Sequence, residues 1–232
     1  MKKVENVFYY LILSTAAAFL LLVLAFFSSS NINTIGTHDR LFVGGVFVAS
    51  CIFGISLAIY PGWLRRSLKI GSRSENKRKP QKTMRKGHHP DCDQFQNHII
   101  RIGNKTLCAG CFGLSMGSII SIFLMIIYVI ITSGWPPVMF RFLLLIGLIM
   151  IGFVYVEIMF PMRNTIVHVL SNVFLVISFL IIAIGIFEIT GSKIYGTVGI
   201  LLSFLWLDTR VQLSRWCHTL ICSNCNETCK MY

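Results

Sequence analysis

Residues 165–187 read "TIVHVLSNVFLVISFLIIAIGIF", an apolar run in which His168 is the only side chain that can carry a charge. A helix crosses a hydrocarbon core of about 30 Å with about 20 apolar residues, so this run predicts a membrane span. The sequence therefore predicts an all-α polytopic membrane protein with about six transmembrane helices. The five other apolar runs occupy 7–28, 41–60, 112–132, 138–160 and about 194–209.

The amino-acid composition agrees with a membrane location. Hydrophobic residues make up 55% of the 232-residue chain, against about 45–50% in ordinary soluble domains. The first apolar run follows Lys2 and Lys3, as the core of a signal peptide would. Its length exceeds the roughly 7–15 residues of such a core, and no clean small-residue cleavage site follows, so we expect an uncleaved anchor.

Basic residues are distributed unevenly over the two expected faces of the membrane. Of the 21 lysine and arginine residues, all but Arg40, Arg141 and Lys193 fall on the face that carries both termini and the loop 61–107. Positively charged loops stay in the cytoplasm, so we expect a multi-pass protein of the plasma membrane with cytoplasmic N- and C-termini. The formal net charge of +12 favours contact with anionic lipid head groups. No aromatic side chains interleave with the basic ones, so nucleic-acid binding is not expected.

The order of apolar, basic and cysteine-rich segments predicts five parts. Short connections between the later spans force neighbouring helices to be antiparallel. The expected parts are a two-helix N-terminal membrane hairpin (1–60), a basic flexible linker (61–86), a Cys/His metal-binding module (87–113), a four-helix membrane bundle (112–209) and a Cys-rich cytoplasmic tail (210–232).

The metal-binding module is predicted from residues 87–113, "GHHPDCDQFQNHIIRIGNKTLCAGCFG". Zinc prefers four tetrahedral nitrogen or sulfur ligands, commonly offered as two close pairs. His89 and Cys92 form the first pair, and Cys108 and Cys111 form the second. In the reducing cytosol, clustered cysteines are metal ligands or redox groups more often than structural disulfides.

The segment between the two pairs predicts a β-hairpin. Residues 98–102 and 105–107 read as strands joined by a tight turn, and the second pair runs directly into the third span. This order of knuckle, hairpin, second knuckle and helix is that of a treble-clef zinc finger, so the large cytoplasmic loop is expected to hold a small zinc knuckle. Gly110 and Gly113 suit tight knuckle turns, because glycine tolerates positive φ.

Two further histidines widen the choice of ligands. His88 is an alternative to His89, and His98 replaces either one or acts as a fifth, exchangeable ligand or as a group that orients a bound ligand. If His98 coordinates and one position stays open, the site has the form of a catalytic zinc centre. A redox dithiol at Cys108 and Cys111 is the alternative to a metal site.

The segment 92–117 resembles the signature of a family of small prokaryotic membrane proteins of unknown function. Members of that family carry a Cys-His motif before a short stretch that ends in C-A-R-C-x-G and a membrane helix. Asp93 stands where the family has histidine, and Gly110 where it has arginine. The resemblance covers only this segment and implies a membrane protein with a Cys/His site. The matching positions are Cys92, Gly103, Cys108, Ala109, Cys111, Gly113 and Gly117.

A second cysteine cluster lies near the C-terminus. Its thiols and imidazole favour a second zinc site, so one or two zinc ions per chain are expected. An iron–sulfur cluster is less favoured, because the spacing does not match the usual ferredoxin run. Alternatively, these cysteines complete the first site, or they form a reduced tail that binds nothing. The residues are Cys217, His218, Cys222, Cys225 and Cys229.

Three ionisable residues are predicted near the cytoplasmic ends of spans. Glu157 precedes Pro161 by four residues and His168 follows Asn164 by four, so both side chains lie about one helical turn below the surface. Asp208 ends the last span on the same side. Charged groups inside spans are rare and usually functional, so Glu157, His168 and Asp208 are candidates for a ligand pocket. The alternative is a structural Glu157–His168 pair that joins helices.

These features support three hypotheses. The first is a non-catalytic membrane protein whose zinc site structures the surface loop and docks a protein partner or subunit. The second is a membrane thiol–disulfide oxidoreductase that uses Cys108 and Cys111 at a helix N-terminus. The third is a metal-dependent membrane enzyme with a pocket around Glu157 and His168. Catalytic residues stay unassigned, because the sequence contains no H-E-x-x-H, Walker loop or G-x-S-x-G motif.

Overall fold

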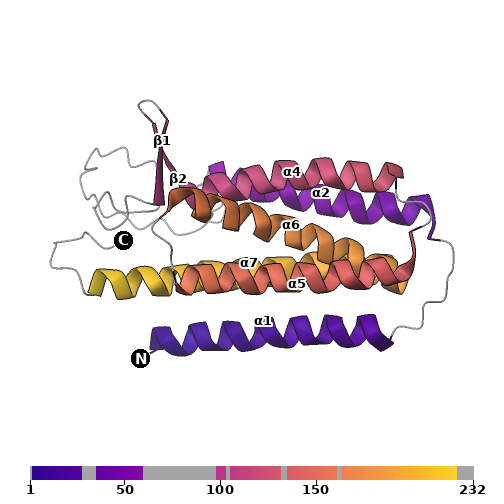
Figure 1. Cartoon of the computed structure of the whole chain (residues 1–232), viewed down its shortest axis with the longest axis horizontal. Coiled ribbons are helices and arrows are strands. Elements are labelled where there is room, and N and C mark those ends of the chain that lie inside the picture. Colours follow the sequence, from indigo (N-terminus) through magenta and orange to yellow (C-terminus); the bar gives the residue numbers. More distant parts are fainter. Residues whose placement is uncertain are drawn as a thin grey trace, which may run out of the picture.

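The computed structural model describes residues 2–27, 35–59, 98–102, 105–131, 135–160 and 164–223 (Figure 1). Long helices run side by side, and a two-stranded hairpin lies at one end of them. Six helices in the described ranges are long and apolar enough to cross a membrane, which confirms an all-α, multi-pass membrane protein. They are α1 (Lys2–Phe27), α2 (Thr37–Ile59), α4 (Ala109–Ile131), α5 (Pro137–Met159), α6 (Thr165–Thr190) and α7 (Lys193–Ser223).

The small hairpin marks one end of the bundle. Strand β1 (Ile99–Ile102) pairs antiparallel with β2 (Lys105–Cys108), and Ile99 lies opposite Cys108. Successive helices alternate in direction, so α1, α4 and α6 start at this end while α2, α5 and α7 finish there (Figure 1). We call it the hairpin end, and the opposite end the far end. The hairpin expected from the sequence is confirmed.

Helix α6 forms the core of the bundle. In its most apolar window 72% of the residues are buried, against 22–39% in the other five helices. It packs against α4, α5 and α7, and Leu175, Ile182 and Ile186 are fully enclosed. A helix that is apolar on all sides is expected inside a bundle rather than at its surface. The run 165–187 therefore forms the axis around which the other helices pack.

Small residues allow α4 to approach α6 closely. A Cβ added at Gly113 would lie 2.5 Å from the carbonyl oxygen of Val169, and one at Gly117 would lie 2.9 Å from the Val173 Cα. Such spacing of small residues is typical of membrane helices whose backbones touch. The sequence predicts tight knuckle turns at Gly110 and Gly113, but both residues are helical. Gly113 instead allows the close packing of α4 on α6.

A polar network joins three helices near the middle of the bundle. The Tyr155 hydroxyl of α5 lies 3.1 Å from Ser14 Oγ of α1 and donates to the Trp206 carbonyl oxygen of α7 at 3.0 Å. The Trp206 indole in turn donates to the Ser14 carbonyl oxygen at 3.2 Å. In apolar surroundings, hydrogen bonds between helices take the place of those that polar groups would make with water. This network attaches α1 to the bundle.

The arrangement of the first two and the last helices differs from the expectation. Helices α1 and α2 do not form a pair, because α1 packs mainly on α7 and α2 on α4. Helix α7 does not end near 209 but continues to Ser223, so residues 210–223 of the expected tail are helical. The stripe Trp206, Arg210, Leu213 and Cys217 has helical spacing and explains the extension, because the first three are buried and Cys217 is half-buried.

The far end is held by ion pairs. Arg40 of α2 lies 3.1 Å from Glu188 of α6, and the Tyr128 hydroxyl of α4 donates to the same carboxylate. Lys193 of α7 lies 3.3 Å from Asp39 of α2. These contacts use most of the ionisable groups described at this end, so the chemistry of interest lies at the hairpin end.

Candidate functional site at the hairpin end

Two thiols meet where the hairpin joins α4. Cys108 is the last residue of β2, and Cys111 lies in the first turn of the helix that follows without a loop. The Cys108 Sγ lies 3.8 Å from the position of a Cβ on Gly110, and the two thiols are close enough to interact. No disulfide joins them, and both side chains are partly buried. The second predicted pair is therefore assembled as a pair in the folded chain.

A carboxylate–imidazole pair lies at the same end of the bundle as the thiols. His168 Nδ1 of α6 is 3.2 Å from Glu157 Oε1 of α5, and both side chains are buried. Asn172 donates its side-chain amide to the His168 carbonyl oxygen, and Ser171 lies close to the Glu157 carboxylate. The pairing of Glu157 with His168 was expected from their similar depth, and the structure contains this contact.

Two further histidine rings extend from His168 through edge-on contacts. The His98 ring, immediately before β1, packs edge-on against His168 at 4.5 Å between centroids. The same ring packs edge-on against His218 of α7 at 5.4 Å. His98 thereby seats the hairpin on α6 and α7, which joins residues far apart in the sequence.

Arg210 is the residue of this site that the sequence reasoning missed. Its side chain projects from α7 and is 8% exposed. Its Nη2 lies 3.4 Å from the position of a Cβ on Gly110, at the start of α4. Cys108, Cys111 and Glu157 are close enough for their charges to interact with the guanidinium. The helical spacing from Trp206 to Cys217 was the signal that could have found it, had the last helix been continued past 209.

The remaining candidates are more dispersed. Cys217 donates its thiol to the Ile158 carbonyl oxygen at 3.4 Å, so it packs against α5. Asp208 lies two residues before Arg210, about 200° away around α7, and accepts a hydrogen bond from Gln212 at 3.4 Å. No described contact brings Asp208 to the Glu157–His168 pair.

Several predicted ligands lie outside the part of the chain that the structure describes. Among the described residues alone, no three His, Cys, Asp or Glu side chains are arranged to hold a metal ion. The first predicted knuckle pair and the end of the tail therefore stay predictions. Backbone but not side chain is described for Cys222, and His88, His89, Cys92, Cys225 and Cys229 are outside the described ranges.

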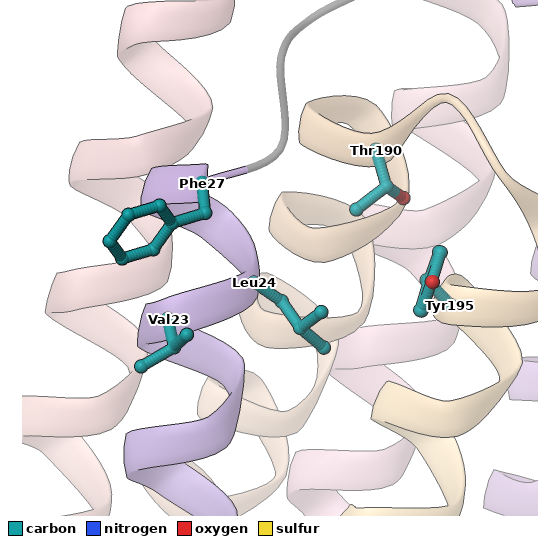
Figure 2. Close-up of a pocket in the computed structure, with 5 residues that line it drawn as sticks. All are labelled: Val23, Leu24, Phe27, Thr190 and Tyr195. Carbon is teal, nitrogen blue, oxygen red and sulfur yellow. The ribbon is translucent and has the colours of Figure 1, made fainter.

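A hollow at the far end lacks comparable chemistry. It has a volume of about 210 Å³ and lies between the end of α1 and the α6–α7 connection (Figure 2). Val23, Leu24 and Phe27 line it from α1, and Thr190 and Tyr195 supply its hydroxyls. The Thr190 hydroxyl already donates to a carbonyl of its own helix. The hollow carries no charged side chain.

The hairpin end thus combines two thiols, a carboxylate–imidazole pair and a buried guanidinium. Thiolates bind soft metals or exchange with disulfides. A carboxylate bonded to an imidazole moves protons or orients the ring. Comparison with known proteins adds no assignment, since no family model, curated protein or solved structure matches this chain.

Proposed function

We propose that this integral membrane protein carries a zinc–thiolate centre that fixes its large surface loop to the helical bundle and orders that surface for a protein partner. Cys108 and Cys111 are the two ligands in the described part of the chain. His89 and Cys92 complete the set, with His88 and His98 as the alternatives. The centre is structural in this proposal and binds the partner without a chemical step.

One observation carries the proposal: the two thiols lie side by side at the junction of a β-hairpin and a helix. Two sulfur ligands of one tetrahedral zinc ion are about 3.8 Å apart, given a Zn–S bond of about 2.3 Å. Cys108 and Cys111 are close neighbours in the folded chain, as two ligands of one ion have to be. The Arg210 guanidinium is near enough to both thiols to offset part of the negative charge that two zinc-bound thiolates would carry.

The charge distribution supports a cytoplasmic position for this centre. The loop 61–107 and both termini hold most of the basic residues. They connect to the bundle at the hairpin end, because α1 and α4 start there and α2 and α7 finish there. A cytoplasmic site stays reduced, which keeps cysteine side chains available for zinc. In this proposal the protein resides in the plasma membrane with the hairpin end facing the cytoplasm.

Metal analysis of the purified full-length protein tests the proposal. We expect about one or two zinc ions per chain, and the combined substitution Cys108→Ser and Cys111→Ser should remove at least one of them. Cys51→Ser is the matched control, because Cys51 is a buried thiol in α2 at a distance from the hairpin. Zinc absent from the parent protein, or retained in full by the double variant, would refute a zinc centre at this pair.

A thiol–disulfide oxidoreductase is the second candidate, because the same contact suits a redox dithiol at a helix N-terminus. The N-terminal end of α4 and the Arg210 guanidinium both favour a thiolate at this position. Mass spectrometry after alkylation separates the two functions. A metal-free protein with a reversible Cys108–Cys111 disulfide would establish the redox function in place of the zinc centre.

A further inference from the structure

Arg210 has more hydrogen-bonding capacity than its described neighbours use. The side chain is more than nine-tenths buried, and its Nε has no hydrogen-bond partner among the described residues. An arginine stays charged even when buried, and a buried charge without a bonded counter-ion is costly. Glu157 is near enough to interact with this charge, but its Oε2 also has no partner in the described structure. The cation and the carboxylate are therefore neighbours without a direct bond.

The guanidinium is aimed at the beginning of a long helix. Its Nη2 reaches to 3.4 Å from the Cβ position of Gly110, in the first turn of the 23-residue helix α4. The first turn of a helix presents backbone N–H groups that have no acceptor within the helix, together with the positive end of its dipole. The absence of a side chain at Gly110 leaves this backbone open to Arg210. The guanidinium and the N-terminal turn of α4 both attract an oxyanion.

Two buried hydrogen-bond acceptors lie near these groups, Glu157 beside Arg210 and Asn172 against α4. Asn172 packs against Gly113, one helical turn below Gly110 on nearly the same face of α4. Its Oδ1 is buried without a partner in the described residues, as is Glu157 Oε2. A ligand that satisfies the whole site therefore offers an anionic group to the guanidinium and hydroxyl donors to the two acceptors.

The depth of the site matches that of lipid phosphates. Arg210 is level with the first turn of α4, and Glu157 lies in the last turn of α5. Helix α5 is about 34 Å long, close to the thickness of a hydrocarbon core of about 30 Å. The site therefore lies at the boundary where apolar chains meet head groups.

We propose that Arg210 and the first turn of α4 bind the phosphate of a polyol phosphate, with Glu157 and Asn172 accepting hydrogen bonds from its hydroxyl groups. This binding site goes beyond the zinc centre, and it shares Arg210 and the first turn of α4 with the proposed ligands Cys108 and Cys111. The same chemistry occurs in the head group of phosphatidylglycerol and in free glycerol phosphate. Arginine reads a phosphate through two parallel N–H bonds, which a lysine cannot reproduce.

Thermal unfolding of the full-length protein in neutral detergent micelles tests this site. Tryptophan fluorescence reports the unfolding temperature while phosphatidylglycerol is added in graded amounts, with phosphatidylcholine as the blank. A second arm adds glycerol 3-phosphate to micelles without phosphatidylglycerol. We expect one of the two probes to raise the unfolding temperature, and the arm that does so identifies the lipid or the soluble source.

Substitutions on α7 assign the effect to the site. Arg210→Gln should raise the half-saturating concentration of the probe about ten- to hundredfold, because it removes a charge-assisted hydrogen bond. Arg215→Gln is the matched control, since it removes the same charge from an exposed position on the same helix and should leave binding unchanged. Arg210→Lys keeps the charge and should still lose affinity, which decides the matter if Arg210→Gln does not fold.

Two results would overturn the proposal. The first is a parent protein whose unfolding temperature responds to neither probe. The second is an Arg210 variant with the same half-saturation as the parent and Arg215→Gln, which would mean that general attraction to a basic surface explains the effect. Zinc content measured on the same samples keeps this result separate from the fate of the metal centre.

Discussion

The contact between α4 and α6 leads to a quantitative prediction for Gly113→Ala. The new Cβ would lie 2.5 Å from the Val169 carbonyl oxygen and 2.8 Å from the Asn172 Cβ. Ordinary van der Waals contact begins near 3.4 Å, so the distance to the carbonyl must grow by 0.9 Å. Because the obstacle is backbone, it cannot rotate away as a flexible side chain would. The two helices have to separate.

The cost of this separation follows from the packing that is lost. A gap of about 0.5–1 Å forfeits a quarter to a half of the dispersion energy between facing atoms. Overpacking of this kind typically lowers the free energy of unfolding by about 1–3 kcal/mol. For a chain of this size, each kcal/mol corresponds to about 2–4 °C in Tm, so we expect a fall of about 2–12 °C.

Thermal unfolding in detergent, followed by circular dichroism, measures the effect. Gly152→Ala on α5 is the control, because a Cβ there meets nothing within 4 Å. Alanine is a better helix former than glycine by up to about 1 kcal/mol, so the control should be as stable as the parent or slightly more stable. If Gly113→Ala unfolds at the temperature of Gly152→Ala, the close approach of α4 and α6 is refuted.

Two further substitutions probe polar contacts inside the bundle. Glu157→Gln removes the charge that faces His168 and should lower the free energy of unfolding by about 1.5–3 kcal/mol; chemical denaturation measures this, and an unchanged midpoint would contradict the pairing. Tyr155→Phe removes the hydroxyl that contacts Ser14 and the Trp206 carbonyl, at a cost of about 1–3 kcal/mol. It should also speed proteolysis within α1, and cleavage at the parent rate would show that the network does not hold this helix.

The membrane helices were predictable because their signal is local. The run 112–132 was expected to span the membrane, and α4 occupies Ala109–Ile131. The hairpin before it was predictable for the same reason, since its strands are adjacent in sequence. The depth of Glu157 and His168 followed from counting residues to the nearest turn, because the helical rise is constant. Each of these predictions needed only neighbouring residues.

The rest of the site depends on contacts between distant segments. Arg210 contacts the start of α4 at Gly110, which lies one hundred positions earlier in the chain. No local sequence pattern specifies that contact. The contact of His98 with His168 and His218 arises only when the hairpin folds onto α6 and α7. Arg210 was also hidden because its charge was attributed to a tail beyond the last span. A buried arginine in an apolar helical stripe is visible only once α7 is continued to Ser223.

The attachment of α1 to α7 has a consequence for biosynthesis. Helix α1 leaves the ribosome before the other helices, but its main partner is the last of them. The contact of Ser14 with Trp206 spans 192 positions, so it forms only after α7 has been translated and inserted. Until then α1 has only its smaller contacts with α5 and α6, among them that of Ser14 with Tyr155. Chains that stop short of α7 therefore lack the largest contact surface of their first helix.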